Sequence, residues 1–364
     1  MILLDQLLES TVYNQGSDLH IKAESPPLVR IHGDLMQLDL DPLTPEEAKW
    51  LCFSILTDTQ KARFEEELEL DFAYEIAGVA RFRCNLYMQR GYVGGAFRVI
   101  PYEIKTIEDL MLPDIVRTFS ERPRGLVLVT GPAGSGKSTT QAAMIDYINR
   151  TRAEHIITVE DPVEFVHEDR YSLINQRELD TDTLSFQGAL RSALREDPDV
   201  ILIGEMRDLE TIQLAITAAE TGHLVFGTLH TTDAIQTVDR VIDVFPTHQQ
   251  QQVRMQMSVN LIGVISQTLI KRRDGQGRLA AFETLVAIPA VRNLIRESKT
   301  FQIGSIMQTG HRHGMITLDQ SLANLVNSGM VSYEDARAKA ANTIEFDALV
   351  GKQPGDGRRN GGRE

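Results

Sequence analysis

The sequence is short of cysteine, of long apolar runs and of basic residues, and each shortage excludes a class of protein. Its two cysteines, Cys52 and Cys84, stand far apart and match neither a disulfide framework nor a C-x-x-C metal site, which favours a reducing compartment. No apolar run approaches the ~18 residues of a membrane-spanning helix. The apolar start, Met1 to Glu9, carries acids where a signal peptide has bases, so we expect an amphipathic helix in a cytoplasmic protein.

Basic residues number 37 against 51 acidic ones, which gives a formal net charge of -14. This excess of acid opposes tight binding to phosphate backbones, so no nucleic-acid partner is expected. The 364 residues, 42% hydrophobic and 24% charged, have the composition of an ordinary globular protein and are enough for two domains.

The segment Gly131 to Ser138 fits the phosphate-binding pattern G-x-x-x-x-G-K-[ST], known as a P-loop. An apolar run that predicts a strand enters it, and a predicted helix leaves it, so its glycines can converge backbone N–H groups on phosphate at a helix N-terminus. Lys137 would reach the terminal phosphates of ATP, and Ser138 would ligate Mg²⁺. The residues expected to bind the nucleotide are Gly131, Pro132, Ala133, Gly134, Ser135, Gly136, Lys137, Ser138 and Thr139.

The strand and helix signals divide the chain into two domains. Residues 1–102 alternate short strands with helices and predict a small α+β domain, and the proline-containing segment 103–123 predicts a linker. In residues 124–350 apolar strands alternate with helices, which is typical of an α/β fold with a mostly parallel sheet. The Gly- and Arg-rich tail, 351–364, is expected to be disordered.

Polar residues with catalytic potential follow three strands of the predicted parallel sheet. Glu160 and Glu164 follow one, Glu205 the next, and His230 the last. Ligands in such sheets bind beyond the carboxyl ends of the strands, so these residues are expected around one nucleotide. Glu205 is the first choice for the carboxylate that orients the attacking water, although Gly204 replaces the aspartate that usually precedes it. The others have open alternatives: helix capping or arginine pairing for the two glutamates, and a structural role for the histidine.

Three arginines of the small domain are candidates to complete the site across a domain cleft. Arg81, Arg83 and Arg98 lie on predicted strands, and the first two share a face because side chains alternate along a strand. Arginine clamps phosphate through two hydrogen bonds, whereas surface solvation is the competing interpretation.

Beyond Pro246 the signals are weaker. A polar run of glutamines leads into a predicted long helix, whose apolar positions are Val253, Met257, Leu261, Val264, Ile265 and Leu269. A basic segment, Lys271 to Arg278, then predicts a turn before a strand. His311 and His313 have a spacing compatible with metal binding, but no third ligand is apparent, so a metal site is not expected there.

Together these residues resemble the type II/IV secretion ATPase superfamily, and most closely its type IV pilus retraction (twitching motility) ATPases. The resemblance extends to about residue 345. The segments that carry it are the P-loop, Glu160 to Glu164, Asp197 to Asp208, Glu220 to Thr231, Arg81 to Gly91, and Ala290 to Glu297.

This resemblance implies a PAS-like domain before a RecA-like P-loop core, assembled as a homo-hexameric ring in which ATP hydrolysis drives pilin depolymerisation. Glu205 would be the catalytic carboxylate, His230 part of a histidine box, and the small-domain arginines would reach the phosphates. It also implies a cytoplasmic location at the pilus base, an inner-membrane platform protein as partner, and a retraction paralogue as a further candidate partner.

Extension and secretion ATPases usually add a large N-terminal domain and a four-cysteine zinc module. This sequence has neither feature, which favours retraction. Two alternatives stay open: an accessory retraction paralogue, and a nucleotide-gated scaffold at the pilus base with little turnover. A motor that translocates nucleic acid is disfavoured by the net charge.

Overall fold

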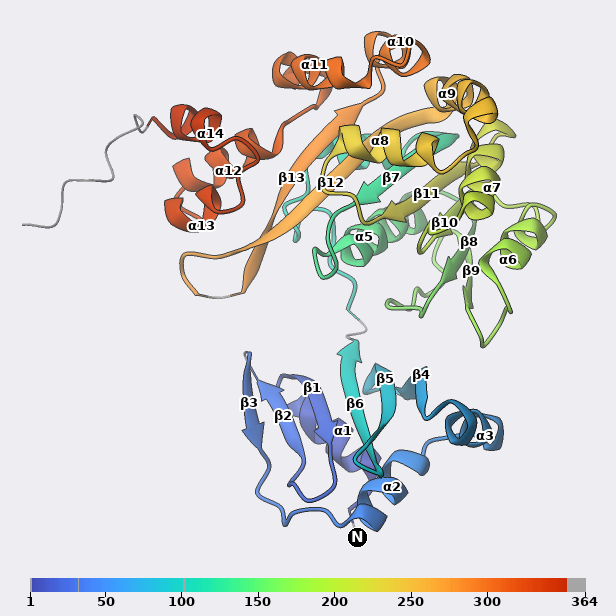
Figure 1. Ribbon diagram of the computed structural model, residues 1–364, viewed down its shortest axis with the longest axis vertical. Helices are drawn as coiled ribbons and strands as arrows, with labels where there is room; N and C mark the ends of the chain where they lie inside the picture. Colours follow the sequence, from blue (N-terminus) through green and yellow to red (C-terminus); the bar gives the residue numbers. More distant parts are fainter. Residues whose placement is uncertain (1, 32, 101–102, 276, 352–364) are drawn as a thin grey trace, which may run out of the picture. The chain divides into compact units, whose positions relative to one another are not determined.

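The computed structural model describes residues 2–31, 33–100, 103–275 and 277–351 (Figure 1). The chain forms two compact units. One comprises the described residues up to Glu103 together with Pro162–Val166, and the other comprises the described remainder from Ile104 onward. Apart from Gly351, the tail expected to be disordered lies outside the described residues.

The first unit is an antiparallel sheet with three helices. Its elements are α1 (Leu4–Tyr13), β1 (Gly16–Ile21), β2 (Leu28–Ile31), β3 (Asp34–Gln37), α2 (Pro45–Phe53), α3 (Asp58–Glu67), β4 (Glu69–Ile76), β5 (Ala80–Gln89) and β6 (Tyr92–Ile100). The strands lie in the order β3-β2-β1-β6-β5-β4, and every neighbouring pair is antiparallel.

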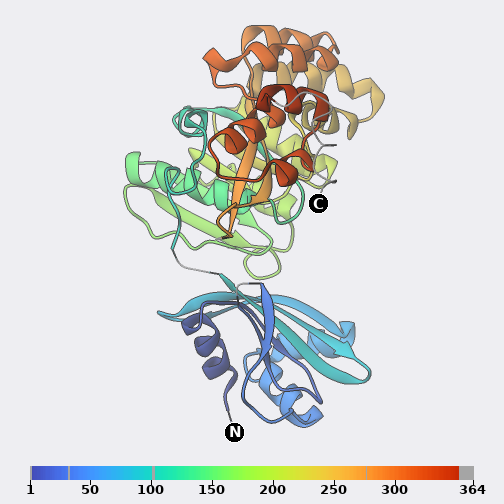
Figure 2. The ribbon, with the colours of Figure 1, turned by 90° about the vertical axis from the view of Figure 1, so that its left-hand side faces the viewer.

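One face of this sheet packs on the helices (Figure 2). Leu19 of β1, Phe82 of β5 and Phe97 of β6 are completely buried there, together with Leu8 of α1 and Leu51 of α2. Because side chains alternate along a strand, the residues between these apolar positions project from the opposite face.

Side chains that cap the helices explain where several of them begin. At the start of α2, the hydroxyl of Thr44 accepts from the N–H of Glu47 at 3.2 Å, and the carboxylate of Glu47 accepts from the N–H of Thr44 at 2.8 Å. In the second unit, Asp208 accepts from the N–H of Thr211 at 2.9 Å and so starts the helix that follows it. Each cap satisfies N–H groups that the helix itself leaves without acceptors.

The second unit contains a seven-stranded sheet and most of the helices. Its elements are α4 (Asp114–Ser120), β7 (Gly125–Thr130), α5 (Lys137–Thr151), β8 (His155–Glu160), β9 (Leu173–Glu178), α6 (Phe186–Ala193), β10 (Val200–Ile203), α7 (Leu209–Glu220), β11 (Leu224–Leu229), α8 (Ala234–Asp243), α9 (Thr247–Asn260), β12 (Leu261–Lys271), β13 (Arg278–Val286), α10 (Pro289–Arg296), η1 (Thr300–Gln302), α11 (Ile303–Thr309), η2 (His311–His313), α12 (Leu318–Asn327), α13 (Tyr333–Arg337) and α14 (Thr343–Val350).

The strand order in this sheet, β13-β12-β7-β11-β10-β8-β9, places the strand that enters the glycine-rich turn between β12 and β11. All neighbouring strands are parallel except the β12–β13 hairpin. The last residue of β11, Leu229, pairs with the last residue of β7, Thr130. The carboxyl ends of β7, β11, β10 and β8 therefore meet at one edge of the sheet.

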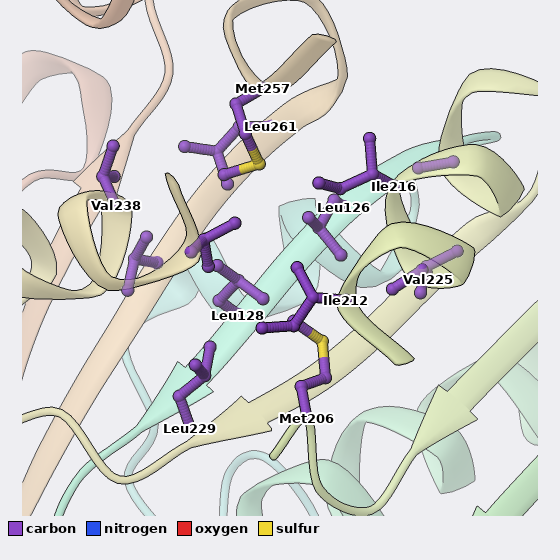
Figure 3. Close-up of a cluster of buried hydrophobic side chains, with 14 of the residues drawn as sticks. Leu126, Leu128, Met206, Ile212, Ile216, Val225, Leu229, Val238, Met257 and Leu261 are labelled. Atoms are coloured by element: carbon purple, nitrogen blue, oxygen red, sulfur yellow. The ribbon is translucent and has the colours of Figure 1, made fainter. Parts of the chain in front are cut away.

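Both faces of the seven-stranded sheet are covered, which explains its continuous apolar strands. On one face, side chains of α7 to α9 pack against strand residues such as Leu126, Leu128 and Val225 (Figure 3). On the other face, α4 and α5 pack against residues such as Val127 and Val129. Helices α12 to α14 form a smaller cluster with the far ends of β12 and β13.

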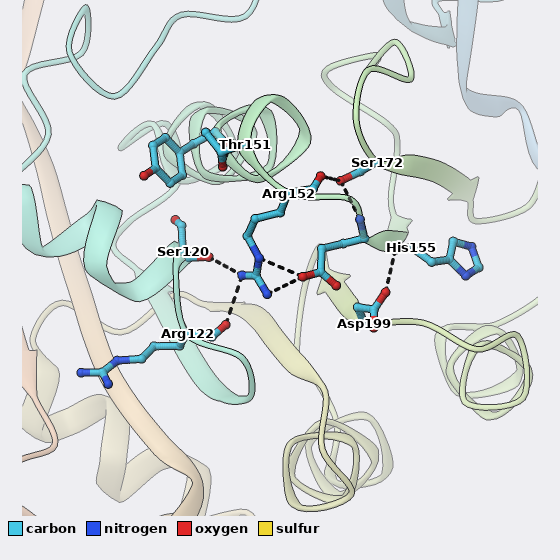
Figure 4. Close-up of polar contacts among 9 residues, drawn as sticks. Ser120, Arg122, Thr151, Arg152, His155, Ser172 and Asp199 are labelled. Carbon is cyan, nitrogen blue, oxygen red and sulfur yellow. Dashed lines mark hydrogen bonds and ion pairs between the residues drawn. The ribbon is translucent and has the colours of Figure 1, made fainter.

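A polar cluster around Arg152 fixes the sheet edge opposite the carboxyl ends (Figure 4). The guanidinium of Arg152, which follows α5, donates to Glu154 at 2.9 Å and to the carbonyl oxygens of Ser120 at 2.9 Å and Arg122 at 3.3 Å. The hydroxyl of Ser172 donates to the carbonyl oxygen of Arg152 at 2.8 Å. These bonds tie the end of α4 to the connection between α5 and β8.

The structure corrects one expected element and adds detail to another. The helix expected to run through Leu269 ends at Asn260, and Leu261–Lys271 forms strand β12. A run that is apolar on all sides does not distinguish a buried helix from a strand buried on both faces, and the β-branched residues here favour the strand. The segment expected as a linker contains α4, whose Val116 and Phe119 are buried in the core.

Among the described residues, none of the helices combines the length and the apolar character needed to cross a bilayer.

Candidate active site

The backbone conformation of the turn between β7 and α5 depends on glycine. Gly131, Gly134 and Gly136 have φ angles of 143°, 71° and 90°, a region that side chains disfavour. A Cβ atom on Gly131 would lie 2.3 Å from the carbonyl oxygen of Gln267 and 2.6 Å from the hydroxyl oxygen of Ser135. No side chain caps the N-terminus of the 15-residue helix α5, so its first N–H groups point into the turn.

Beside this turn, His230, which follows β11, contacts both Lys137 at the start of α5 and Glu205, which follows β10. The Nζ atom of Lys137 donates to the carbonyl oxygens of Gly131 at 3.0 Å and Pro132 at 3.2 Å, and lies 3.5 Å from Nδ1 of His230. The Nε2 atom of His230 lies 3.0 Å from Oε1 of Glu205. A lysine ammonium can only donate and a carboxylate can only accept, so a neutral imidazole with its proton on Nε2 satisfies both contacts.

Glu205 is held as a carboxylate at this position. Burial raises the pKa of Glu205, but the hydrogen bond and charge of Arg207 and the contact with His230 outweigh it, and its pKa lies below the ordinary value. The guanidinium of Arg207 is 2.6 Å from Oε1 of Glu205 and about two-thirds exposed. The carboxylate is thus charged, as a group that orients a water molecule must be.

Close packing between β8 and β10 explains why glycine precedes Glu205. A Cβ atom on Gly204 would lie 3.1 Å from both the Cα of Glu160 and the carbonyl oxygen of Val159, closer than ordinary contact. Glu160 itself accepts from the hydroxyl of Thr158 at 2.6 Å and from the amide of Gln176 at 3.2 Å. The usual aspartate would not fit at residue 204 without movement of β8.

Ser138 and Thr139 lie in the first turn of α5, at the positions expected for nucleotide and metal contacts. The hydroxyl of Ser138 is partly exposed and takes part in no hydrogen bond within the described part of the chain. The described residues contain no cluster of three histidine, cysteine or acidic side chains that could hold a metal by themselves. This donor set fits Mg²⁺, which keeps most of its waters and binds through a single side chain and substrate phosphates.

The other expected site residues lie in the first unit. Glu164 belongs to the segment Pro162–Val166, which groups with that unit. Arg83 and Arg98 are cross-strand neighbours on β5 and β6, and Arg81 is two residues away on the same face, opposite the buried phenylalanines. The expectation that Arg81 and Arg83 share a face is thus confirmed, and the structure adds Arg98 to that face.

Three other histidines, His223 and the closely spaced pair His311 and His313, have structural or solvent-exposed surroundings. His223 precedes β11, at the opposite edge of the sheet from the phosphate turn, and its Nδ1 lies 2.8 Å from the carbonyl oxygen of Ala218. His311 and His313 are exposed in the short helix η2. In the described ranges, no group of three metal-ligating side chains includes any of these histidines.

The sequence does not predict that two further residues, Arg207 and Gln267, belong to this site. Arg207 lies in a segment that resembles the family, but nothing in the pattern indicates that it pairs with Glu205. Gln267 lies in the stretch that the apolar spacing assigns to a helix, so its position beside the phosphate turn becomes visible only when β12 is recognised as a strand.

The chain matches known proteins over almost its whole length. The family model of the type II/IV secretion system proteins matches residues 107–292. The type IV pilus retraction ATPase PilT of Pseudomonas aeruginosa is 55% identical over 93% of this chain and 98% of its own length. The type IV pilus ATPase PilU of the same organism is 39% identical over 95% of this chain and 91% of its own length.

A solved structure gives the same result in three dimensions. The crystal structure of the pilus retraction motor PilT with bound ADP covers 96% of this chain and 100% of its own, at 47% identity and a TM-score of 0.90. The expected fold class, a RecA-like core preceded by an α+β domain, and the expected enzyme class, a nucleotide-binding ATPase, are confirmed. The chain belongs to the type II/IV secretion system protein family and, within it, to the type IV pilus retraction ATPases.

Proposed function

We propose that this chain is the motor that hydrolyses ATP to retract type IV pili by depolymerising pilin, the process behind twitching motility. The observation that carries the proposal is the contact of Lys137, His230 and Glu205 beside the glycine turn. It brings the ammonium of Lys137, the imidazole of His230 and the carboxylate of Glu205 to one point, in a fold shared with a retraction motor whose crystal structure holds ADP.

In this proposal the residues of the turn bind the triphosphate, and the strand-end residues act on its terminal phosphate. The ammonium of Lys137, which now donates to two carbonyl oxygens of its own loop, turns to the terminal phosphates when ATP is bound. This movement releases Nδ1 of His230 from Lys137, while the Nε2–H of His230 continues to donate to the carboxylate of Glu205. The carboxylate of Glu205 accepts a proton of the attacking water and orients it in line with the leaving group.

Ser138 would hold Mg²⁺, which supplies positive charge to the phosphate oxygens when it is bound. Glu160 and Glu164 are the acidic residues proposed to orient the waters of that ion. Glu160 already has two hydrogen-bond donors, Thr158 and Gln176, which keep its carboxylate in place at the end of β8.

The proposed assembly is a homo-hexameric ring at the cytoplasmic side of the inner membrane. Its partners there would be the platform protein of the pilus base and a retraction paralogue. In the ring, arginines of the small domain reach the phosphates and neutralise the charge that develops during hydrolysis. Arg83 is the first choice among them because, unlike Arg98, which pairs with Asp18 at 2.8 Å, it has no side-chain partner among the described residues.

Loss of the protein followed by a count of surface pili tests the biological role. A retraction motor predicts an excess of pili that do not shorten, restored to normal by the wild-type chain but not by Lys137→Ala. Too few pili would indicate extension and contradict the proposal. Normal pilus dynamics with Lys137→Ala would favour a scaffold that acts without hydrolysis.

Pilus retraction in cells that lack every other retraction ATPase separates a main motor from an accessory paralogue. A main motor shortens pili under these conditions. If retraction required a second ATPase in the same cell, the accessory role would replace the one proposed here.

A further inference from the structure

Gln267, on β12, is buried on the side of the phosphate turn that faces the sheet. Its side chain makes hydrogen bonds with this turn and with helix α5. Its side chain is 3% exposed, and both of its polar atoms are bonded to the loop or to helix α5. The amide Nε2 donates to the carbonyl oxygen of Ser135 at 2.7 Å. The Oε1 accepts from the hydroxyl of Thr140 at 2.9 Å.

The orientation of this amide follows from its partners. A backbone carbonyl oxygen can only accept, so the NH₂ group of Gln267 must face Ser135, and its oxygen is left for Thr140. Ser135 and Thr140 are each 2% exposed, so water does not compete for either contact. Both bonds are therefore fixed parts of the site.

The bond to Ser135 controls the direction of an N–H group in the turn. In a planar trans peptide the C=O and the following N–H point in opposite directions. When the carbonyl of Ser135 points down to Gln267, the N–H of Gly136 in the same peptide points up, away from the sheet and into the turn. Gly136 has a φ of 90°, a conformation in which this peptide would flip readily without an anchor.

We infer that Gln267 is a positioning residue for nucleotide binding, which fixes the Ser135–Gly136 peptide so that the N–H of Gly136 donates to a phosphate of the bound nucleotide. The position of the strand supports this role. Ser266, the preceding residue, pairs with Thr130 at the end of β7 and donates to or accepts from its hydroxyl at 2.8 Å. The register of β12 against β7 therefore determines where Gln267 lies along the sheet, within hydrogen-bonding distance of Ser135.

This inference rests on nucleotide binding at the turn, which is part of the proposed function, and predicts an effect on affinity more than on turnover. Loss of the amide donor should raise the Kd for ADP about tenfold, the effect of one well-formed hydrogen bond. The KM for ATP should rise with it, whereas kcat at saturating ATP should change less than about threefold, because the strand-end residues are untouched.

The decisive test uses Gln267→Glu in the purified full chain, with ADP titrated at two pH values. At pH 8 the ionised carboxylate repels the carbonyl of Ser135, and the Kd for ADP should rise at least about tenfold relative to wild type. At pH 5.5 to 6 the buried carboxyl is protonated, its O–H donates to Ser135 in place of the amide, and the ratio of the two Kd values should return toward one.

Two further variants, Gln267→Met and Thr140→Val, test the same inference if Gln267→Glu does not fold. Gln267→Met keeps length and packing but has no donor, so its Kd ratio should be raised equally at both pH values. Thr140→Val removes only the other bond and should have the smaller effect. Wild-type ADP affinity in folded Gln267→Met, or a defect in Gln267→Glu that is the same at both pH values, would overturn the inference.

Lys137→Ala separates this inference from the nucleotide site as a whole. If it binds ADP as well as the wild type does, the turn is not the nucleotide site and both proposals are wrong. If it loses ADP binding while the Gln267 variants keep it, the site stands and only the role of Gln267 is wrong.

Discussion

The Nε2 atom of His230, at the end of β11, lies 3.0 Å from Oε1 of Glu205, which follows β10. The two residues are 25 positions apart in the chain, and they meet because their strands are parallel neighbours in register. The same imidazole reaches Lys137 of the phosphate turn with its other nitrogen. It therefore connects the lysine expected to reach the terminal phosphates with the carboxylate expected to orient water.

His230→Ala should lower kcat for ATP hydrolysis by about 10- to 100-fold, because Glu205 loses the donor that orients it and pairs more closely with Arg207. The Kd for ADP should change by less than about threefold, since the turn keeps its own contacts. Steady-state phosphate release and an ADP titration measure the two effects. His223→Ala, at the opposite edge of the sheet, is the matched control and should keep wild-type kcat.

Arg83→Ala should lower ATPase activity of the assembled protein by about 100-fold, whereas Arg98→Ala should lower it by less than about tenfold. The difference follows from the partners on the sheet face: Asp18 binds the guanidinium of Arg98 at 2.8 Å, and Arg83 has no such partner in the described residues. Phosphate release by variants of equal assembly measures the effect. Equal losses in both variants would contradict this assignment.

Glu283, on β13, should make the protein less stable as pH rises. Burial raises its pKa to about 6, and the charges of Asp233 and Asp319 act in the same direction, although its carboxylate accepts from the N–H of Ala234 at 2.8 Å. The folded-state pKa lies above the ordinary value of 4.5, so folding favours the neutral form. The penalty is absent below about pH 4.5 and complete above about pH 6.

Relative to Glu283→Gln, the wild-type free energy of unfolding should therefore fall by about 2 kcal/mol between about pH 4.5 and 7. Denaturant unfolding across this range measures the difference. Glu334→Gln, on the exposed surface of α13, should run parallel to the wild type. A constant difference between wild type and Glu283→Gln would show that burial of the carboxylate does not shift its titration.

Arg292, on α10, holds the junction between α9 and β12. Its guanidinium donates to the carbonyl oxygens of Ser258 at 2.9 Å, Leu261 at 2.9 Å and Ala287 at 2.7 Å, and also to that of Val259. These carbonyl groups include the end of α9, which has no donors within the helix itself.

Arg292→Leu should destabilise the protein by at least about 2 kcal/mol, because several carbonyl groups lose their donor. Arg292→Lys should recover only part of this, since an ammonium cannot reach all of them. The matched control is Arg296→Leu, one turn along the same helix, where the side chain bonds only Asn293 among the described residues and the cost should be within about 0.5 kcal/mol. Thermal and denaturant unfolding measure these changes.

The sequence predicts the centre of this site well because local pattern and topology agree there. The motif around Lys137 determines its own backbone, since the glycines and the helix start are adjacent in the chain. Glu205 and His230 could be placed beside it because both follow apolar strands, and strands that alternate with helices form parallel sheets whose carboxyl ends share one edge.

The contacts that hold the site together could not be predicted in the same way. Gln267 is 132 positions from Ser135, and the two residues meet only because β12 pairs with β7. The apolar run around Gln267 satisfies the spacing of a helix as well as that of a buried strand, so periodicity alone misassigns it. The pairing of Arg207 with Glu205 depends on side-chain conformation, which no spacing rule determines.

The central claim is that Glu205 activates water at a triphosphate held by the turn that contains Lys137. Its most direct test is phosphate release by purified Glu205→Gln, measured together with ATP affinity. The account predicts a Kd for ATP within about twofold of wild type and a rate at least about 100-fold lower. Phosphate release at the wild-type rate by a fully folded Glu205→Gln protein would contradict it.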